Sequence, residues 1–210
     1  MTRLLIVGAT GLVGQQVVAQ ALADPRVSQV VALTRRAMPP QDGLENVVVD
    51  FADLPRQADW WAVDGVVCAM GTTRAKTSSP DVYRQIDYGY PLAIARLARE
   101  HGATRFALTS SLGADARSRF AYPRLKGELE EALTGLGFPS LTIARPSVLS
   151  GDRAERRFGE RAWVVALRLL APLVPRRLRI SPASAVAATL LDGAVAGPPG
   201  VHFKYNEDMG

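Results

Sequence analysis

The segment Ile6–Val18, IVGATGLVGQQVV, decides the fold of this chain. It places Gly8, Gly11 and Gly14 at three-residue intervals directly after the apolar run Arg3–Gly8, whose branched side chains are typical of a strand buried on both faces. Apolar residues then recur at helical spacing until an Asp-Pro dipeptide ends the pattern. The segment therefore predicts a strand, a tight loop and a helix, in that order.

A loop of this kind, between a first strand and a first helix, is where the pyrophosphate of a dinucleotide binds. Glycines let the backbone approach the phosphates, and the start of the helix supplies free N–H groups and the positive end of its dipole. The spacing G-x-x-G-x-x-G differs from the common G-x-G-x-x-G, and a turn that needs glycine only for its backbone angles is the alternative. The position of the loop favours cofactor binding.

Strand-like and helix-like stretches alternate along the rest of the chain. Branched apolar runs predict further strands at Gln29–Thr34, Asn46–Asp50, Asp64–Met70, Arg105–Ser111, Ser140–Pro146 and Val201–Tyr205. Helical patterns cover Pro80–Glu100, Arg119–Leu136, Glu155–Leu170 and Pro182–Val195. The first of these is expected to kink or restart at Tyr90-Pro91, because proline cannot donate to the preceding turn. The alternation predicts an α/β fold, a doubly wound parallel sheet with helices on both faces, in a single domain over residues 1–210.

The composition excludes several classes of protein. With 48% hydrophobic and 21% charged residues, the 210-residue chain can bury one sizeable core and is not expected to be disordered. The single cysteine, Cys68, allows no internal disulfide and agrees with a reducing cytoplasm, the location we expect. His101 and His202 are far apart and give no metal-ligand spacing, so we expect no metal site. The longest apolar run, Ala162–Pro175, is interrupted and too short to cross a bilayer, and we expect no membrane association.

The net charge of +5 is concentrated late in the chain, where eight arginines lie between Arg153 and Arg179. A basic cluster can bind nucleic acid, but no interleaved aromatic residues or known nucleic-acid motif accompany this one. We therefore interpret it as a solvated helix face and do not expect a nucleic-acid partner.

The end of the predicted second strand indicates which dinucleotide binds. An NAD site usually carries Asp or Glu about twenty residues after the glycines. Here that position is Thr34, and Arg35 and Arg36 follow it. Two arginines suit the 2′-phosphate of NADP, so the sequence predicts NADPH in preference to NADH, the alternative being two solvent-exposed loop arginines. Asp50 closes the next strand and is a candidate partner for the adenine amino group, or else it caps the following turn.

A second set of residues points to hydride transfer to a carbonyl. Tyr122 stands eleven residues after Ser111, and Lys126 is four residues further on, so a helix places tyrosine and lysine on one face. Pro123 agrees with this only in the first helical turn, where its missing N–H costs nothing. A phenol exchanges protons poorly at neutral pH unless its anion is stabilised, and a lysine ammonium one turn away would do this. A serine hydroxyl opposite would hold the carbonyl oxygen in line with the tyrosine.

These residues and the glycine loop carry a family resemblance. The chain resembles the short-chain dehydrogenase/reductase superfamily in its atypical branch, and within it the Tat-interacting-protein-like oxidoreductases and their small bacterial NAD(P)-binding relatives. The matching segments are GATGLVG (8–14), TRR (34–36), CAMGTT (68–73), TSSLGAD (109–115), YPRLKGELE (122–130) and RPSVLSG (145–151).

The resemblance implies a Rossmann-like fold and a role for each site residue. Its pyrophosphate-loop residues are Gly8, Thr10, Gly11, Leu12, Val13 and Gly14. Arg35 and Arg36 would meet the 2′-phosphate, Gly71 and Thr72 would lie near the adenine ribose, and Pro146 and Val148 would line the nicotinamide pocket. Tyr122 would be the proton donor, Lys126 its partner and a ribose contact, and Ser111 the carbonyl holder, with Ser110 as the fallback.

The chain also departs from the family pattern. The spacing from serine to tyrosine is slightly short, a proline directly follows Tyr122, and Ser147 stands where relatives often have glycine. Each departure loosens the inferred geometry, but none removes a reacting group.

Two functional classes remain open. The first is an NADPH-dependent reductase of a small carbonyl compound, with helices in residues 151–200 on the substrate side. The second is a non-catalytic NADPH-binding regulator or redox sensor that acts through a protein partner, because one fold can serve either role. The apolar face within residues 156–175 favours core packing or a subunit interface over a substrate site, so a homo-oligomer is also possible.

Overall fold

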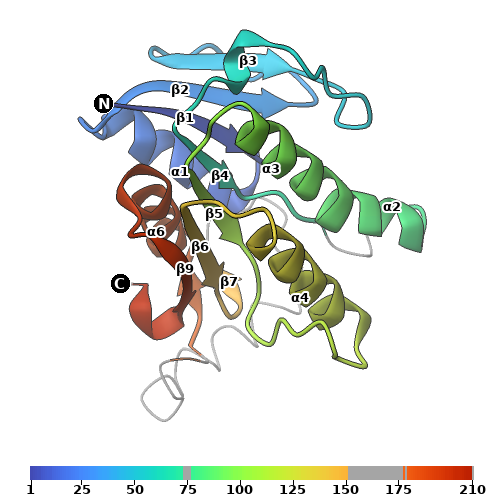
Figure 1. The fold of residues 1–210 in the computed structure, drawn as a ribbon. Helices are drawn as coiled ribbons and strands as arrows, with labels where there is room; N and C mark the ends of the chain where they lie inside the picture. The colour runs from blue at the N-terminus through green and yellow to red at the C-terminus, as the bar shows by residue number, and fades with distance from the viewer. Residues whose placement is uncertain (73–76, 151–176, 178, 210) are drawn as a thin grey trace.

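A computed structural model describes residues 1–72, 77–150, 177 and 179–209. Its centre is a seven-stranded sheet with the order β3-β2-β1-β4-β5-β6-β9, and every neighbouring pair is parallel (Figure 1). The strands are β1 (Thr2–Val7), β2 (Val27–Thr34), β3 (Leu44–Val48), β4 (Gly65–Cys68), β5 (Arg105–Thr109), β6 (Ser140–Arg145) and β9 (Gly200–Tyr205). Two short strands, β7 (Leu149–Ser150) and β8 (Ser181–Pro182), pair separately. The predicted doubly wound parallel sheet is confirmed.

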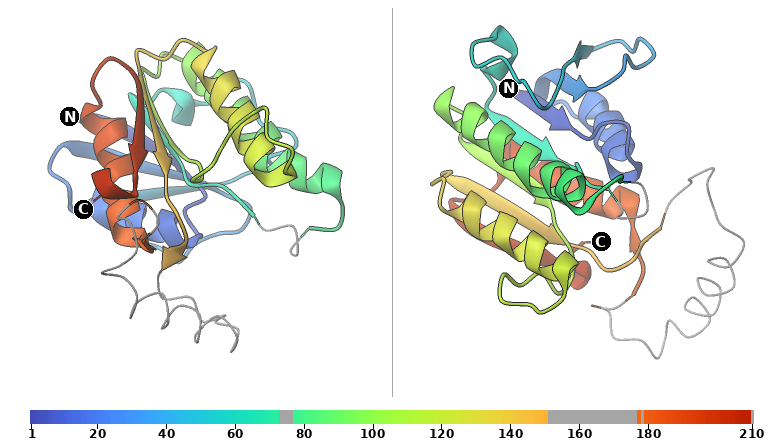
Figure 2. Two further views of the ribbon diagram at one scale, coloured as in Figure 1. Left: turned by 90° about the horizontal axis from the view of Figure 1, so that it is seen from below. Right: turned by 90° about the vertical axis from the view of Figure 1, so that its right-hand side faces the viewer.

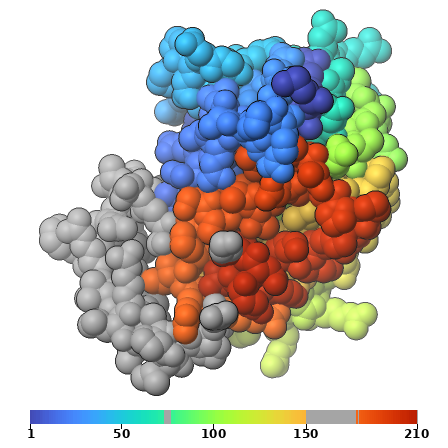
Figure 3. Space-filling view, turned by 90° about the vertical axis from the view of Figure 1, so that its left-hand side faces the viewer, coloured from blue at the N-terminus to red at the C-terminus, as the bar shows by residue number. Residues whose placement is uncertain are grey.

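Helices cover both faces of the sheet. On one face lie α1 (Leu12–Ala23) and α6 (Ala183–Ala196), which pack side by side (Figures 2 and 3). On the other face lie α3 (Tyr90–Glu100) and α4 (Ala121–Thr134) (Figures 1 and 2). Short helical turns also occur at η1 (Asp59–Trp61) and η5 (Asn206–Asp208). The winding direction changes between β1 and β4, which makes the end of β1 the topological switch point of the sheet.

Alternation along the central strands produces two cores. In β1, Leu5 and Val7 belong to the cluster under α3 and α4, whereas Leu4 and Ile6 belong to the cluster under α1 and α6. All four side chains are fully buried. Because both faces of β1 are buried, its sequence is a continuous apolar run, and this run predicts the strand from the sequence alone.

The helix predicted over Pro80–Glu100 is interrupted. It consists of α2 (Pro80–Arg84), a π-helical turn, η3 (Gln85–Gly89), and α3, which restarts at Tyr90 with Pro91 in its first turn. The kink or restart predicted at Tyr90-Pro91 corresponds to the change from the π-helical turn to α3, with Pro91 in the first turn of α3, and Gly89 keeps helical dihedrals at this change. The π-helical turn was not predicted.

Two of the other three predicted helices are present in the described residues. The helix expected over Arg119–Leu136 is α4 with two residues fewer at each end, and Pro123 lies in its first turn as predicted. The helix expected over Pro182–Val195 is α6, with Pro182 as its N-cap. The helix expected over Glu155–Leu170 lies outside the described residues. Of the helices that the structure describes, none is long and apolar enough to span a bilayer.

Candidate functional site

The predicted site residues come together at the carboxyl edge of the sheet. Parallel strands end at the same edge, and ligands of open α/β sheets bind in the loops that follow those ends. The loops after β1, β2, β4, β5 and β6 and the first two turns of α1 and α4 hold all of the predicted residues except Asp50, which follows β3.

The glycine loop has the backbone that a dinucleotide requires. Gly8 has a φ of +84°, and a β-carbon there would lie 2.6 Å from the backbone of Ala69 in the loop after β4. A β-carbon at Gly14 would collide with the Gly8 carbonyl oxygen. Gly11 is the N-cap of α1 and makes no side-chain cap bond, so the first-turn N–H groups remain available to an anion. These features fit a bound pyrophosphate.

The remaining loop residues differ in what they can offer. Thr10 is exposed, and its carbonyl oxygen accepts a 3.3 Å bond from Gln15 Nε2. Leu12 and Val13 pack on the core under α1, and Val13 is only 5% exposed. Val13 can therefore contribute its backbone N–H, but its side chain belongs to the core.

The loop after β2 presents two arginines to solvent. Arg35 and Arg36 are exposed, and neither forms an ion pair with any residue in the described part of the chain. The Thr34 hydroxyl holds the loop by donating a 2.8 Å bond to the Arg36 carbonyl oxygen. Asp50 is also exposed, and its Oδ1 accepts the Ala52 N–H at 2.9 Å. It therefore caps the next turn, one of its two expected roles.

The loop after β4 contacts an acidic residue that the sequence analysis did not single out. Asp87 lies in the π-helical turn and is 1% exposed. Its Oδ1 accepts the backbone N–H of Thr72 at 2.7 Å, and its Oδ2 lies 3.1 Å from Lys126 Nζ. The backbone at Gly71 is beside both charged groups, since a β-carbon there would lie 3.7 Å from Asp87 Oδ2 and 3.8 Å from Lys126 Nζ.

Helix α4 carries the candidate proton donor and its partner. The Lys126 side chain is 5% exposed, whereas Tyr122 is 44% exposed at the start of the helix. Lys126 Nζ lies 6.0 Å from the centre of the Tyr122 ring, on the helix face that the four-residue spacing predicted. A buried ammonium and a solvent-accessible phenol therefore lie next to each other.

The two serines after β5 have different partners. Ser110 is buried, and its hydroxyl donates to Oε1 of Glu130 on α4. Ser111 is half-buried, and within the described residues its hydroxyl makes a single 3.3 Å bond, to the Leu112 carbonyl oxygen. Ser111 is therefore the serine whose hydroxyl can turn to a ligand, while Ser110 is committed to the scaffold.

Glu130 also joins α4 to β6. Its carboxylate is 5% exposed and forms an ion pair with Arg145, whose Nε lies 3.0 Å from Oε1 while Nη2 contacts Oε2. This contact raises the pKa of the Arg145 guanidinium above its ordinary value. Arg145 Nη1 donates to the Tyr205 hydroxyl of β9 at 3.1 Å. Strands β5, β6 and β9 are therefore tied to the helix that carries Tyr122 and Lys126.

The residues after β6 are also placed near this edge. Pro146 is buried, and its carbonyl oxygen accepts the Leu112 N–H at 2.8 Å, which fixes the chain after β6 beside the serine loop. Val148 is 57% exposed. Of the predicted substrate-side segment 151–200, residues 151–176 and 178 lie outside the described part of the chain.

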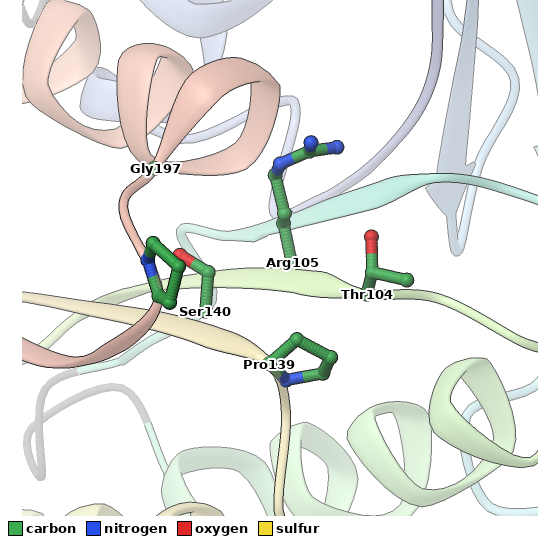
Figure 4. A pocket seen from close by; sticks show the side chains of 6 residues that line it. Thr104, Arg105, Pro139, Ser140 and Gly197 are labelled. Atoms are coloured by element: carbon green, nitrogen blue, oxygen red, sulfur yellow. The ribbon is translucent and has the colours of Figure 1, made fainter.

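A cavity of about 270 Å³ lies at the opposite, amino edge of the sheet, lined by Thr104, Arg105, Pro139, Ser140, Gly197 and Pro199 (Figure 4). Arg105 and Ser140 are neighbours on β5 and β6 and extend toward the side where α6 ends at Gly197. We assign the candidate site to the carboxyl edge, where the glycine loop, Tyr122 and Lys126 lie.

Comparison with known proteins identifies the family. A family model described as NAD(P)H-binding matches residues 8–158, a span that begins at the first glycine of the loop and includes Tyr122 and Lys126. The chain belongs to the NAD(P)H-binding family. Curated relatives of this NAD(P)H-binding protein include Protein FMP52, mitochondrial, from Candida albicans, 37% identical over 158 residues covering 71% of this chain and 68% of the relative. The Aspergillus fumigatus protein of the same name is 36% identical and covers 81% and 75%.

Solved structures support the same fold. MoeE5 in complex with UDP-glucuronic acid and NAD superposes with a TM-score of 0.73 at 18% identity, covering 96% of this chain and 75% of that one. The Bordetella bronchiseptica enzyme WbmG in complex with NAD and UDP gives a TM-score of 0.69 at 17% identity, covering 97% and 72%. At such identities the likeness shows the fold alone, a Rossmann-like domain.

The comparisons contradict the expected cellular location and support the family resemblance only in its general form. The cytoplasmic location was wrong: three of the curated relatives, at 36–37% identity, are named mitochondrial proteins. A lone cysteine excludes an internal disulfide, but it does not distinguish one reducing compartment from another. The named relatives are FMP52 proteins and the matching family is described as NAD(P)H-binding, so the comparisons support the NAD(P)-binding part of the resemblance and not its Tat-interacting-protein-like detail.

The sequence analysis missed Asp87, which contacts Lys126 and the loop after β4, and also the Glu130–Arg145 pair, which holds the scaffold behind the site. Glu130 continues the four-residue spacing of Tyr122 and Lys126, and this signal was present in YPRLKGELE. Asp87 had no signal beyond its place near the restart of the helix, because its partners are distant in sequence. Within the described residues, no group of three or more His, Cys, Asp and Glu side chains could hold a metal ion.

Proposed function

We propose that this protein is an NADP(H)-dependent oxidoreductase that reduces the carbonyl group of a small molecule through Ser111, Tyr122 and Lys126. The observation that carries the proposal is the buried Lys126 ammonium, one helical turn from the accessible Tyr122 at the edge where the glycine loop lies. Lysine is almost never fully buried unless it is paired, and Asp87 pairs with Lys126 on the side of the loop after β4. The family match to NAD(P)H-binding proteins supplies independent support for the cofactor.

The residues would divide the reaction as follows. The residues of the glycine loop and Arg35 and Arg36 would hold NADPH, which would supply the hydride for the carbonyl carbon. Tyr122 gives its hydroxyl proton to the carbonyl oxygen as the C=O bond becomes C–OH, and the Lys126 ammonium stabilises the phenolate that remains. The Ser111 hydroxyl donates a hydrogen bond to the same oxygen and holds it in line with Tyr122. Solvent can return the proton, because Tyr122 is 44% exposed.

Tyr122→Phe tests this chemistry. We expect a loss of turnover of at least about 100-fold, with the dissociation constant for NADPH within about twofold of the wild-type value. The measurement is NADPH oxidation with a panel of aldehydes, ketones and quinones. Tyr90→Phe is the matched control, since Tyr90 packs on Phe51 in the core and its loss of a hydroxyl should leave turnover unchanged. Full turnover in Tyr122→Phe would exclude the mechanism.

One observation favours a second function. The Lys126 ammonium already pairs with Asp87, so the site is also consistent with an NADPH-binding regulator that acts through a protein partner or a second copy of the chain. Tight NADPH binding by the wild type without turnover on any carbonyl in the panel would support this second function over the reductase.

The proposed preference for NADPH rests on the exposed Arg35 and Arg36. Replacing both with alanine should weaken NADPH binding by about 10- to 100-fold and NADH binding by less than about threefold, because only NADPH carries the 2′-phosphate. The control is Arg56→Ala plus Arg96→Ala, which removes the same charge from exposed positions away from the edge. Equal weakening of both dinucleotides would contradict the assignment.

A further inference from the structure

Asp87 connects two parts of the site that are remote in sequence. One carboxylate oxygen accepts the Thr72 N–H at 2.7 Å in the loop after β4, and the other lies 3.1 Å from Lys126 Nζ on α4. Hydrogen bonds to an ionised acceptor are stronger than those between neutral groups. A single carboxylate therefore holds the loop and the lysine in one arrangement.

The contacts continue from this carboxylate to the glycine loop. The loop after β4 begins at Ala69, whose N–H donates to the Val7 carbonyl oxygen at 2.9 Å. Gly8 is packed so closely on Ala69 and Met70 that a β-carbon there would lie 2.6–2.7 Å from their backbones. Movement of the glycine loop must therefore move the loop after β4, and with it the N–H group that Asp87 binds.

The surroundings of Asp87 make the pairing necessary. Asp87 is 1% exposed, and a buried carboxylate is costly unless it is paired. Among the residues that the structure describes, the charged and titratable groups near the pair include Cys68 on β4, Tyr122 at the start of α4, and Glu130 one turn beyond Lys126. Glu130 is neutralised by Arg145, so Asp87 supplies the counter-charge of Lys126. Asp87 also lies in a π-helical turn, an irregularity that is frequent at functional sites.

We propose that Asp87 is a positioning residue that couples dinucleotide binding at the glycine loop to the placement of the Lys126 ammonium. The inference rests on the proposed cofactor site, and it extends that proposal by naming the residue through which the two halves of the site act together. Occupation of the glycine loop fixes the loop after β4, the Thr72 N–H fixes Asp87, and Asp87 fixes Lys126.

The test measures NADPH affinity by fluorescence titration, so it can be read whether or not the protein turns over a carbonyl. Asp87→Asn keeps the size of the side chain but removes its charge, and we expect NADPH to bind about tenfold more weakly. Glu130→Gln is the matched control, a buried and paired carboxylate on the same region of α4, and its NADPH affinity should stay within about twofold of wild type. Equal affinities in the wild type and Asp87→Asn, or equal losses in the two variants, would overturn the proposal.

A double variant separates coupling from a purely structural role. If Asp87 acts through Lys126, the variant Asp87→Asn/Lys126→Met binds NADPH no more weakly than the weaker of the two single variants. Additive losses would show that the residues act independently and would overturn the proposal.

The wild-type protein gives a further measurement should the variants not fold. NADPH should slow amide hydrogen exchange at Thr72 and in the first two turns of α4 together, because Asp87 links them. Protection at the glycine loop with unchanged exchange at Thr72 and around Lys126 would contradict the coupling.

Discussion

Two ion pairs lie one helical turn apart on α4 and differ in construction. Lys126 meets a single oxygen of Asp87, whose other oxygen binds a backbone N–H. Glu130 meets Arg145 through both of its oxygens and also accepts the Ser110 hydroxyl. An ammonium is a compact charge that can exchange partners, whereas a guanidinium fork fixes geometry. Under the proposed function the first pair would serve a ligand, whereas the second holds the scaffold.

The largest expected effect comes from breaking the second pair. Arg145→Met should lower the free energy of unfolding by about 3 kcal/mol, because it leaves the Glu130 carboxylate buried without its counter-charge. Urea denaturation at neutral pH measures this. The matched change in the first pair, Lys126→Met, should cost about 2 kcal/mol, since Asp87 loses one contact to the ammonium, whereas Glu130 loses two contacts to the guanidinium. A larger loss in Lys126→Met would contradict the scaffold role of the second pair.

The buried thiol of Cys68 tests how well the surroundings of the Lys126–Asp87 pair are shielded from water. Burial raises the pKa of the Cys68 thiol to about 11 from its ordinary value of 9.0. The folded protein then keeps the thiol proton between pH 9 and 11, while the unfolded chain releases it, so the free energy of unfolding falls as the pH rises through this range. The fall attributable to Cys68 should approach about 2.7 kcal/mol above pH 11.

The measurement is the difference in pH dependence of unfolding between the wild type and Cys68→Ala. The cavity left by alanine lowers the free energy of unfolding by an amount independent of pH. Only the slope of the free energy of unfolding against pH therefore measures the titration of the thiol. Parallel curves from pH 8 to 11 would show that the thiol is not shielded beside the Lys126–Asp87 pair.

The sequence predicted the fold because its signals are local. The apolar run of β1, the glycines that follow it and the Tyr90-Pro91 restart each act over a few residues, and each appears in the structure. The predicted edge residues also came together, since parallel strands end at one edge. The roles assigned to Ser111, Tyr122 and Lys126 remain predictions.

The ion pairs were not predicted because they are non-local. Asp87 and Lys126 are separated by 39 residues, and Glu130 and Arg145 are joined across a helix and a strand. The sequence does not encode which buried acid meets which buried base; the register of the sheet and the helix contacts decide it. The row Tyr122, Lys126 and Glu130 was readable as one helix face, but the partner of each member was not.

The smallest expected effect distinguishes the two serines. Ser110→Ala removes a hydroxyl that donates to the charged Glu130 in the second pair, so it should lower the free energy of unfolding by about 1.5 kcal/mol in urea denaturation. Ser111→Ala removes a hydroxyl with a single long bond to a carbonyl oxygen, so its stability should stay within about 0.5 kcal/mol of wild type, while its turnover should fall by about 10- to 100-fold. The opposite result, a stable Ser110→Ala with lost turnover, would make Ser110 the carbonyl holder and would move the second pair from the scaffold into the reacting part of the site.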